Sequence, residues 1–178
     1  MAIYPADLEE RWLAGGEPLV IRPIRPSDAA AHEAFFHRLR PEDVRLRFFA
    51  TVRSLSPEQI ARFTHVDYEH SMAFIAVRDA TGETVGVARL VSEDDPDIAE
   101  FAVTVQPDMQ GHGLATHLMQ RLLAWAEFRG IRAVVGEVLA ENAVMLDLLR
   151  RLGFTLRHSP TDAAIIDARL ALPDPSIV

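Results

Sequence analysis

The stretch that decides the fold is residues 98–119, which reads IAEFAVTVQPDMQGHGLATHLM. Its first eight residues, Ile98–Val105, are mostly apolar or β-branched, which is typical of a strand. Residues 107–112 combine proline and glycine as loops do, and residues 113–128 place apolar side chains at helical spacing. The sequence therefore predicts a strand that leads through a glycine-bearing loop directly into an amphipathic helix.

The loop at residues 110–115 is suited to binding an anion. The first turn of a helix has unpaired backbone N–H groups and a partial positive charge, and glycine lets a phosphate approach without meeting a Cβ. The candidate anion-binding residues are Gln110, Gly111, His112, Gly113, Leu114 and Ala115, with the hydroxyl of Thr116 in the first helical turn. His112 is either a phosphate contact or a solvated loop residue. The loop lacks the fingerprints of dinucleotide and Walker sites, so by itself it is equally compatible with a plain strand-to-helix turn.

The remaining elements are predicted outward from this stretch. Upstream we expect a short amphipathic helix within residues 1–18 around Leu8, Trp12 and Leu13, and a strand at 19–24. Helices are expected at 29–39, from after Pro41 to about Phe49, and from Ser56, and strands at 72–78 and 84–92. Downstream we expect a strand at 131–139, a helix at 142–152, strands at 154–158 and 164–172, and a frayed tail at 173–178. A mixed sheet with helices on both faces is the packing that this order favours.

Composition narrows the class of protein. The chain has 178 residues and no cysteine, which excludes disulfides and a cysteine nucleophile, and all 18 basic side chains are arginine. Its net charge of −8 gives no basic footprint for nucleic acid. The same charge would suit a cationic amine or a lysine-bearing protein as partner, although general solubility explains it equally well.

Membrane and metal signals are missing from the sequence. No apolar run approaches the roughly 20 residues that span a bilayer, and the N-terminus has no signal pattern, so we expect a cytoplasmic protein that does not contact membranes. No histidine pair has metal-ligand spacing with a carboxylate, and we predict no metal site. His32 and His37 are expected on a helix surface, and His65 and His70 near a substrate entrance.

Two patterns together resemble the GNAT superfamily of N-acetyltransferases. One is Gln/Arg-x-x-Gly-x-Gly/Ala at the head of a helix, here Gln110, Gly113 and Ala115, and the other is an Asn-initiated helix ending in Gly-Phe, here residues 141–154. The resemblance covers residues 19–172. It implies an α/β (α+β) fold with a mixed, mostly antiparallel sheet of about seven strands and helices on both faces. It further implies one GNAT domain over residues 1–178, with 1–18 as an N-terminal extension, and acetyl-coenzyme A as co-substrate.

Further motifs look like the GNAT domain of Pat-type protein lysine acetyltransferases, namely residues 4–5, 21–26, 47–49, 67–68 and 99–103. In that family the general base lies at the position of Glu100. Strand alternation places Glu100 on the face of Ile98 and Ala102, where apolar neighbours would raise its pKa and make it a better base. A solvated surface glutamate is the alternative.

The resemblance also implies roles for other positions. The strand is expected to splay from its neighbour, so that the backbone of Val103 and Val105 binds the thioester carbonyl and the pantetheine arm. Asn142 is expected to cap its helix, and in the family this residue also contacts the cofactor arm. The family's tyrosine that protonates the leaving thiolate corresponds to Leu149, so another group, water or unaided departure would serve.

The leading hypothesis is direct acetyl transfer, within a ternary complex, from acetyl-CoA to a lysine of a protein. The resemblance implies acyl-CoA synthetases as the protein substrates. The alternatives are a small-molecule amine acetyltransferase and a non-catalytic acyl-CoA-binding regulatory module. The sequence leaves open whether the protein is a monomer or a dimer, and whether this chain stands alone or belongs to a longer one.

Overall fold

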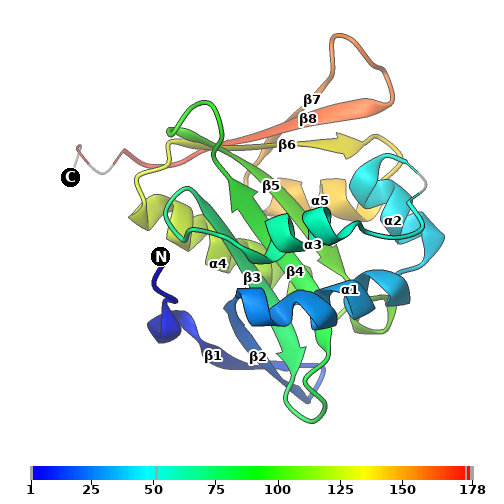
Figure 1. The fold of residues 1–178 in the computed structure, drawn as a ribbon. Helices are drawn as coiled ribbons and strands as arrows, with labels where there is room; N and C mark the ends of the chain where they lie inside the picture. The colour runs from blue at the N-terminus through cyan, green and yellow to red at the C-terminus, as the bar shows by residue number, and fades with distance from the viewer. Residues whose placement is uncertain (1, 51, 175, 177–178) are drawn as a thin grey trace.

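The structure, a computed structural model, describes residues 2–50, 52–174 and 176. Its centre is an eight-stranded sheet in the order β1-β2-β3-β4-β5-β6-β8-β7 (Figure 1). Neighbouring strands are antiparallel except for β5 and β6, which are parallel. The strands are β1 (Glu10–Ala14), β2 (Glu17–Pro23), β3 (Ser71–Arg78), β4 (Thr84–Val91), β5 (Ile98–Val105), β6 (Ala133–Leu139), β7 (Thr155–His158) and β8 (Ile165–Ala171).

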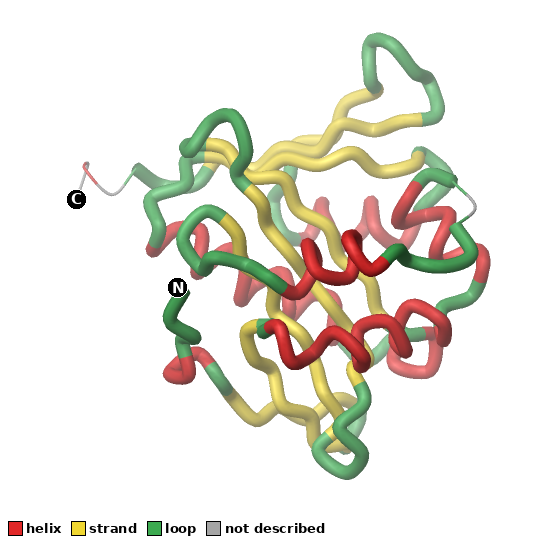
Figure 2. The backbone as a smooth tube through the Cα atoms, in the orientation of Figure 1, coloured by secondary structure: helices red, strands yellow, loops and turns green. Residues whose placement is uncertain are grey.

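Helices cover both faces of this sheet (Figures 1 and 2). They are α1 (Ala29–Arg38), α2 (Pro41–Phe48), α3 (Pro57–Thr64), α4 (Leu114–Phe128) and α5 (Ala143–Arg151). The larger apolar core lies on the α4 and α5 side, where Leu118, Leu122 and Leu149 are fully buried. Smaller clusters lie beneath α1, α2 and α3 on the other side. The mixed, mostly antiparallel sheet between two helical layers confirms the expected fold class.

The predicted amphipathic helix within residues 1–18 is wrong apart from a single 3-10 turn at Ala6–Leu8, and the sheet has eight strands where about seven were predicted. Residues Glu10–Ala14 form β1, which pairs antiparallel with β2 and adds the eighth strand. Gly15 and Gly16 have φ of 55° and 84°, the left-handed conformation that a two-residue hairpin turn requires. A short apolar pattern fits both the helical period and the strand period. The turn at Gly15 and Gly16 is therefore the sequence feature that indicates a strand here.

The β1 strand also braces the helix α4. The Trp12 ring stacks on the His117 ring, with centroids 4.6 Å apart and planes 4° from parallel. The Glu10 carboxylate forms an ion pair of 2.6 Å with Arg121, and His117 Nε2 lies 2.5 Å from the same carboxylate. The first strand of the chain is therefore attached to the helix whose amino end forms the candidate anion site.

Two smaller expectations can be compared directly. Ser56 caps α3 as predicted, because its hydroxyl accepts a hydrogen bond from the Gln59 backbone N–H at 3.1 Å. Of the predicted frayed tail, residues 175 and 177–178 lie outside the described residues. Asp174 accepts a hydrogen bond of 2.7 Å from Arg132, which attaches that part of the tail to the sheet.

Candidate active site

The loop that precedes α4 presents an open backbone. Gly111 and Gly113 have φ of 84° and 79°, and a Cβ at either position would have no atom within 4 Å. No side-chain hydrogen bond caps α4 in the described structure, so its first N–H groups point into the open space at the loop. Residues 110–113 are exposed, Leu114 is buried in the core, and Ala115 and Thr116 are half-buried. This geometry meets the requirements of an anion site at a helix amino end.

Two residues of this loop, Gln110 and His112, contact other segments of the chain. The Gln110 amide donates to the Val105 carbonyl at 3.1 Å, and its oxygen accepts from Arg40 at 3.3 Å. The His112 ring lies against Gly15, where an added Cβ would come within 2.7 Å of Nδ1. His112 is therefore an exposed loop residue that touches the β1–β2 turn, and its contact with a phosphate stays a prediction.

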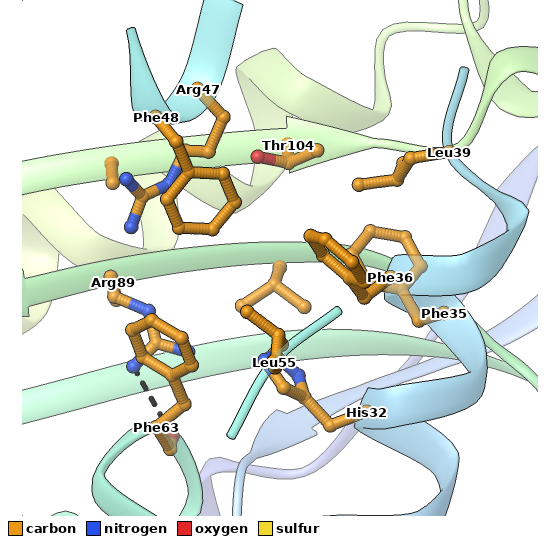
Figure 3. A pocket seen from close by; sticks show the side chains of 12 residues that line it. His32, Phe35, Phe36, Leu39, Arg47, Phe48, Leu55, Phe63, Arg89 and Thr104 are labelled. Atoms are coloured by element: carbon orange, nitrogen blue, oxygen red, sulfur yellow. Dashed lines mark hydrogen bonds between the residues drawn. The ribbon is translucent and has the colours of Figure 1, made fainter. Parts of the chain in front are cut away.

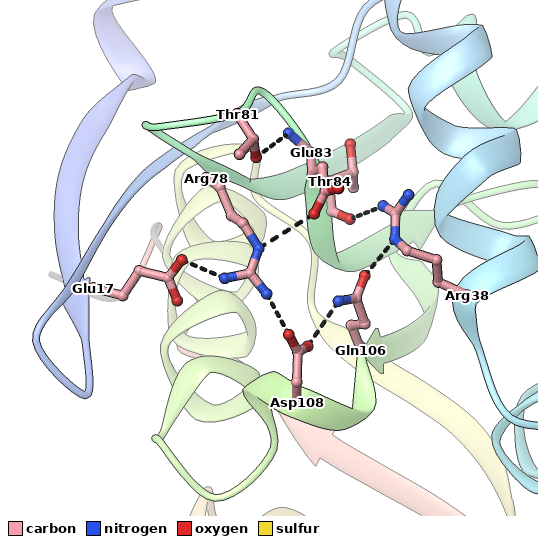
Figure 4. A network of polar contacts seen from close by, with 8 residues as sticks. All are labelled: Glu17, Arg38, Arg78, Thr81, Glu83, Thr84, Gln106 and Asp108. Carbon is pink, nitrogen blue, oxygen red and sulfur yellow. Dashed lines mark hydrogen bonds and ion pairs between the residues drawn. The ribbon is translucent and has the colours of Figure 1, made fainter.

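A polar network fixes the short 3-10 helix Pro107–Met109 immediately before the loop (Figure 4). The Gln106 amide donates to Asp108 at 2.7 Å, and Arg38 donates to the Gln106 side chain at 2.8 Å. Arg38 also donates to the Thr84 carbonyl at 2.8 Å, and Arg78 pairs with the other oxygen of Asp108 at 2.5 Å. The network connects α1, β3 and β4 to the end of β5, so the loop is held from several directions.

The strands β5 and β6 separate after a short paired segment. Their pairing ends at Glu100 and Val135, although β5 continues to Val105. The Phe101 ring packs on Gly136, where any Cβ would come within 2.4 Å of the ring. The expected splay is therefore present, with an aromatic ring lying against a glycine of β6 where pairing ends.

The splay leaves one edge of β5 unpaired with β6. The Gln106 N–H donates to Val85 at 2.8 Å, so alternation directs the backbone groups of Thr104 and Ala102 toward β4. By the same alternation, the backbone groups of Val103 and Val105 are directed toward the splay. The Val105 carbonyl already accepts from Gln110, which leaves the Val105 N–H and both groups of Val103 as candidate ligand contacts.

Glu100 lies on the side of β5 that α1, α2 and α3 cover. Alternation with buried Phe101 and Val103 agrees with the predicted face, but Glu100 is exposed rather than enclosed by apolar neighbours. The prediction of an apolar surrounding is wrong because the helices cover this end of β5 only in part. Burial lowers the pKa of the Arg47 guanidinium, and the nearby Glu100 carboxylate opposes that shift. Glu137 lies two residues beyond Val135, the register partner of Glu100, so it is a second exposed carboxylate on this side that the sequence analysis missed.

Asn142 caps the amino end of α5, and Leu149 lies within that helix. The Asn142 side chain accepts from the Met145 N–H at 3.3 Å, which confirms the predicted cap. Leu149 is fully buried in the core. Arg45 of α2 forms an ion pair with Glu141 at 2.6 Å, which connects α2 to the segment before α5.

The histidines divide into buried and exposed groups. His32 was predicted on a helix surface, but it is only 7% exposed because α1 turns this side chain toward α3 and the sheet. His37 is exposed as predicted. Near Asp67, His70 Nδ1 lies 3.0 Å from the carboxylate, which also accepts backbone hydrogen bonds from the following residues. Burial would raise the pKa of Asp67, but these hydrogen bonds hold it well below its usual range, as expected for a structural turn.

Neither a candidate metal cluster nor a membrane-spanning helix occurs in residues 2–50, 52–174 and 176. These residues contain no group of three or more His, Asp or Glu side chains that could hold a metal ion. None of the helices in this part of the chain has the length and apolar character required to cross a bilayer. The absence of a metal from the chemistry stays a prediction.

Comparison with known families gives the class of protein. The model of the Acetyltransferase (GNAT) family matches residues 33–154, which is more than half of the chain. The chain therefore belongs to the GNAT acetyltransferase family and is an acyltransferase enzyme.

Three individual GNAT proteins are similar to this chain over most of its length. Acetyltransferase PA5475 of Pseudomonas aeruginosa is 35% identical over 162 residues, covering 90% of this chain and 87% of that protein. Acetyltransferase Pat of Mycolicibacterium smegmatis is 30% identical over 139 residues, covering 78% of this chain but only 41% of that protein. The crystal structure of the GNAT domain of S. lividans PAT superposes with a TM-score of 0.87 at 30% identity, covering 96% of this chain and 100% of that domain. These similarities confirm the resemblance to the GNAT domain of Pat-type enzymes.

Proposed function

We propose that this chain transfers the acetyl group of acetyl-CoA to the side-chain amine of a lysine on another protein. The observation that carries the proposal is the continuity of three features. The uncapped amino end of α4 adjoins the unpaired edge of β5, and that edge leads back to the exposed carboxylate of Glu100. A diphosphate bound at the amino end of α4 would direct the thioester along the unpaired edge of β5 toward Glu100.

The residues present fit a coenzyme A molecule in this position. The backbone N–H groups of residues 111–116 would bind the diphosphate, with the Thr116 hydroxyl as a further donor. The free groups of Val103 and the N–H of Val105 would bind the thioester and the pantetheine arm. Because the Asn142 oxygen caps α5, its amide NH₂ is the group left to contact the arm.

The proposed chemistry needs one proton acceptor and one set of hydrogen-bond donors. Glu100 takes a proton from the lysine ammonium, directly or through a water, and the free amine forms a C–N bond to the thioester carbon. The carbonyl oxygen becomes negative and accepts hydrogen bonds from the exposed N–H groups of β5. The C–S bond then breaks, the new amide nitrogen loses its extra proton to solvent, and the released thiolate takes up a proton.

No acid stands at the family's tyrosine position, because Leu149 is apolar and fully buried. A thiol of pKa roughly 8.5 is a competent leaving group near neutrality. We therefore propose that the thiolate leaves unaided or is protonated by water.

Three observations support a protein lysine as acceptor. The chain is similar to two Pat proteins over most of its length. Its net charge of −8 would attract a cationic acceptor, and its lack of lysine removes its own side chains as competing substrates. We propose acyl-CoA synthetases as the substrate proteins, in the cytoplasm.

The test uses the purified chain, acetyl-CoA and a purified acyl-CoA synthetase, with lysine acetylation read by mass spectrometry. We expect Glu100→Gln to lower kcat/KM by about 10²- to 10⁴-fold, the usual contribution of a general base. Glu127→Gln, at an exposed carboxylate near the far end of α4, is the matched control and keeps wild-type activity.

Three outcomes separate the alternatives. Acetylation that is undiminished in Glu100→Gln but lost in Glu137→Gln would move the base to β6. Thiol release with small amines but not with the synthetase would make the acceptor a small molecule. Tight binding of acetyl-CoA without turnover of any amine would favour a non-catalytic module.

A further inference from the structure

A small cavity lies between the sheet and the helices α1, α2 and α3, on the side of β5 that carries Glu100 (Figure 3). Its floor includes Ala102 and Thr104, the next two residues of β5 on that side. The cavity measures about 30 Å³. One water needs about 10–15 Å³ of such cavity volume, so the cavity has room for two waters or for the two oxygens of one carboxylate.

Arg89 brings a charge into this cavity from the centre of the sheet. It lies on β4, is 8% exposed, and donates one hydrogen bond of 3.2 Å to the Phe63 carbonyl. Its guanidinium lies 4.5 Å above the Phe63 ring. Among the described residues no carboxylate lies within ion-pair distance of it. Burial, with a smaller effect from the Arg47 charge, lowers its pKa to about 9, so Arg89 stays charged near neutrality.

Arg47 brings a second cation to the same place from α2. Its guanidinium lies 4.7 Å from the centre of the Phe48 ring and forms no ion pair with the described carboxylates. Figure 3 shows both guanidinium groups at the same end of the cavity, beside the rings of Phe48 and Phe63. Two like charges in one apolar enclosure are costly unless an anion joins them.

His32 from α1 completes the polar lining. It is buried, and its Nδ1 has no hydrogen-bond partner in the described structure. Burial, with Arg89 as the next cause, lowers its pKa to about 4, so its ring is neutral at physiological pH. The nearby Asp28 carboxylate is already paired with Arg22 at 2.6 Å. Glu100, on this side of β5, is a carboxylate whose charge opposes the effect of burial on Arg47, and it is exposed to solvent.

We infer that the cavity formed by Arg47, Arg89 and His32 binds a carboxylate of the substrate beside the reacting atoms. Two guanidinium groups supply charge-assisted hydrogen bonds, and the carboxylate would displace the waters that the cavity can hold. The carboxylate has two possible sources: the far end of a dicarboxylic acyl chain on coenzyme A, or an acidic side chain next to the acceptor lysine. This inference rests on the proposed acyl transfer, because it uses the position of Glu100 on β5.

The donor arm of the test compares two coenzyme A thioesters by calorimetric titration. Succinyl-CoA and butyryl-CoA carry acyl chains of equal carbon number, and only the first ends in a carboxylate. The acceptor arm uses acetyl-CoA and two short peptides in which the lysine adjoins either glutamate or glutamine, and it compares kcat/KM. We expect a preference of about tenfold or more for the carboxylate in one arm, as charge-assisted hydrogen bonds provide.

Substitutions of the cavity arginines test whether the cavity causes the carboxylate preference. Arg89→Met and Arg47→Met should each bring the preference close to unity, while Arg150→Met, at an exposed arginine of α5, should keep it. Thermal unfolding shows whether each variant is folded. If Arg89→Met does not fold, Arg47→Met still tests the inference, because Arg47 is only half-buried. Equal affinity and equal kcat/KM in both arms of the wild type, or a preference that survives both substitutions, overturns the inference.

A titration with acetyl-CoA keeps this test separate from the proposed function. Binding of acetyl-CoA and turnover without any carboxylate preference refutes the cavity assignment alone. No binding of acetyl-CoA refutes the proposed function and the inference that depends on it.

Discussion

The buried histidine His32 should make the protein less stable at mildly acid pH, and substituting it should remove that effect. Burial lowers the pKa of His32 from 6.5 to about 4. Between these two values the unfolded chain binds a proton that the folded chain does not, so the free energy of unfolding falls as the pH drops. The full shift corresponds to about 3 kcal/mol at about 1.4 kcal/mol per pH unit, and about 2 kcal/mol of it is lost between pH 7.5 and 5.

Urea unfolding of the wild type and of His32→Leu at pH 7.5 and pH 5 measures this effect. Leucine fills a similar volume and does not titrate, so the variant should lose about 2 kcal/mol less than the wild type over this interval. His158→Leu, at an exposed histidine of β7, should keep the wild-type loss. Equal losses in the wild type and in His32→Leu would refute the reasoning.

Further predictions concern glycines and the core. Gly113→Ala places a Cβ at φ 79°, which should cost about 1–2 kcal/mol of stability and weaken acetyl-CoA binding. Gly130→Ala, with φ 77° just beyond the other end of α4, should cost as much stability and leave binding unchanged. Urea unfolding measures the stability of both variants, and calorimetry measures their binding of acetyl-CoA. Gly136→Ala should destabilise the protein by about 1–3 kcal/mol because its Cβ would meet the Phe101 ring at 2.4 Å, and a wild-type urea midpoint would contradict this. Leu149→Ala should cost about 2–5 kcal/mol in urea unfolding, since Leu149 is fully buried; a loss below about 1 kcal/mol would contradict its place in the core.

Much of the fold could be predicted because its central elements have strong periodicity and clear ends. The strand Ile98–Val105 has the predicted bounds, and the helix Leu114–Phe128 begins one residue later than predicted. β1 was mistaken for a helix because five residues are too few to separate the two periods. Its strand character comes from the turn at Gly15 and Gly16 and from contacts with α4, which lie far along the chain.

The candidate site could be predicted only in part. The glycine loop and Glu100 lie within one continuous stretch, so local sequence was enough to select them. The cavity residues His32, Arg47 and Arg89 come from α1, α2 and β4, and only packing brings them together. One signal was present in the sequence: Arg89 is the single charged residue within the otherwise apolar strand Thr84–Val91, and an arginine in such a position needs a partner.

The measurement that tests the central claim most directly is the response of the backbone amides to coenzyme A in the isotope-labelled protein, followed by NMR. If the amino end of α4 binds the diphosphate, the amide resonances of residues 111–116 should shift most, together with those of Val103 and Val105. Shifts that leave residues 111–116 unmoved while amides elsewhere respond would contradict the account.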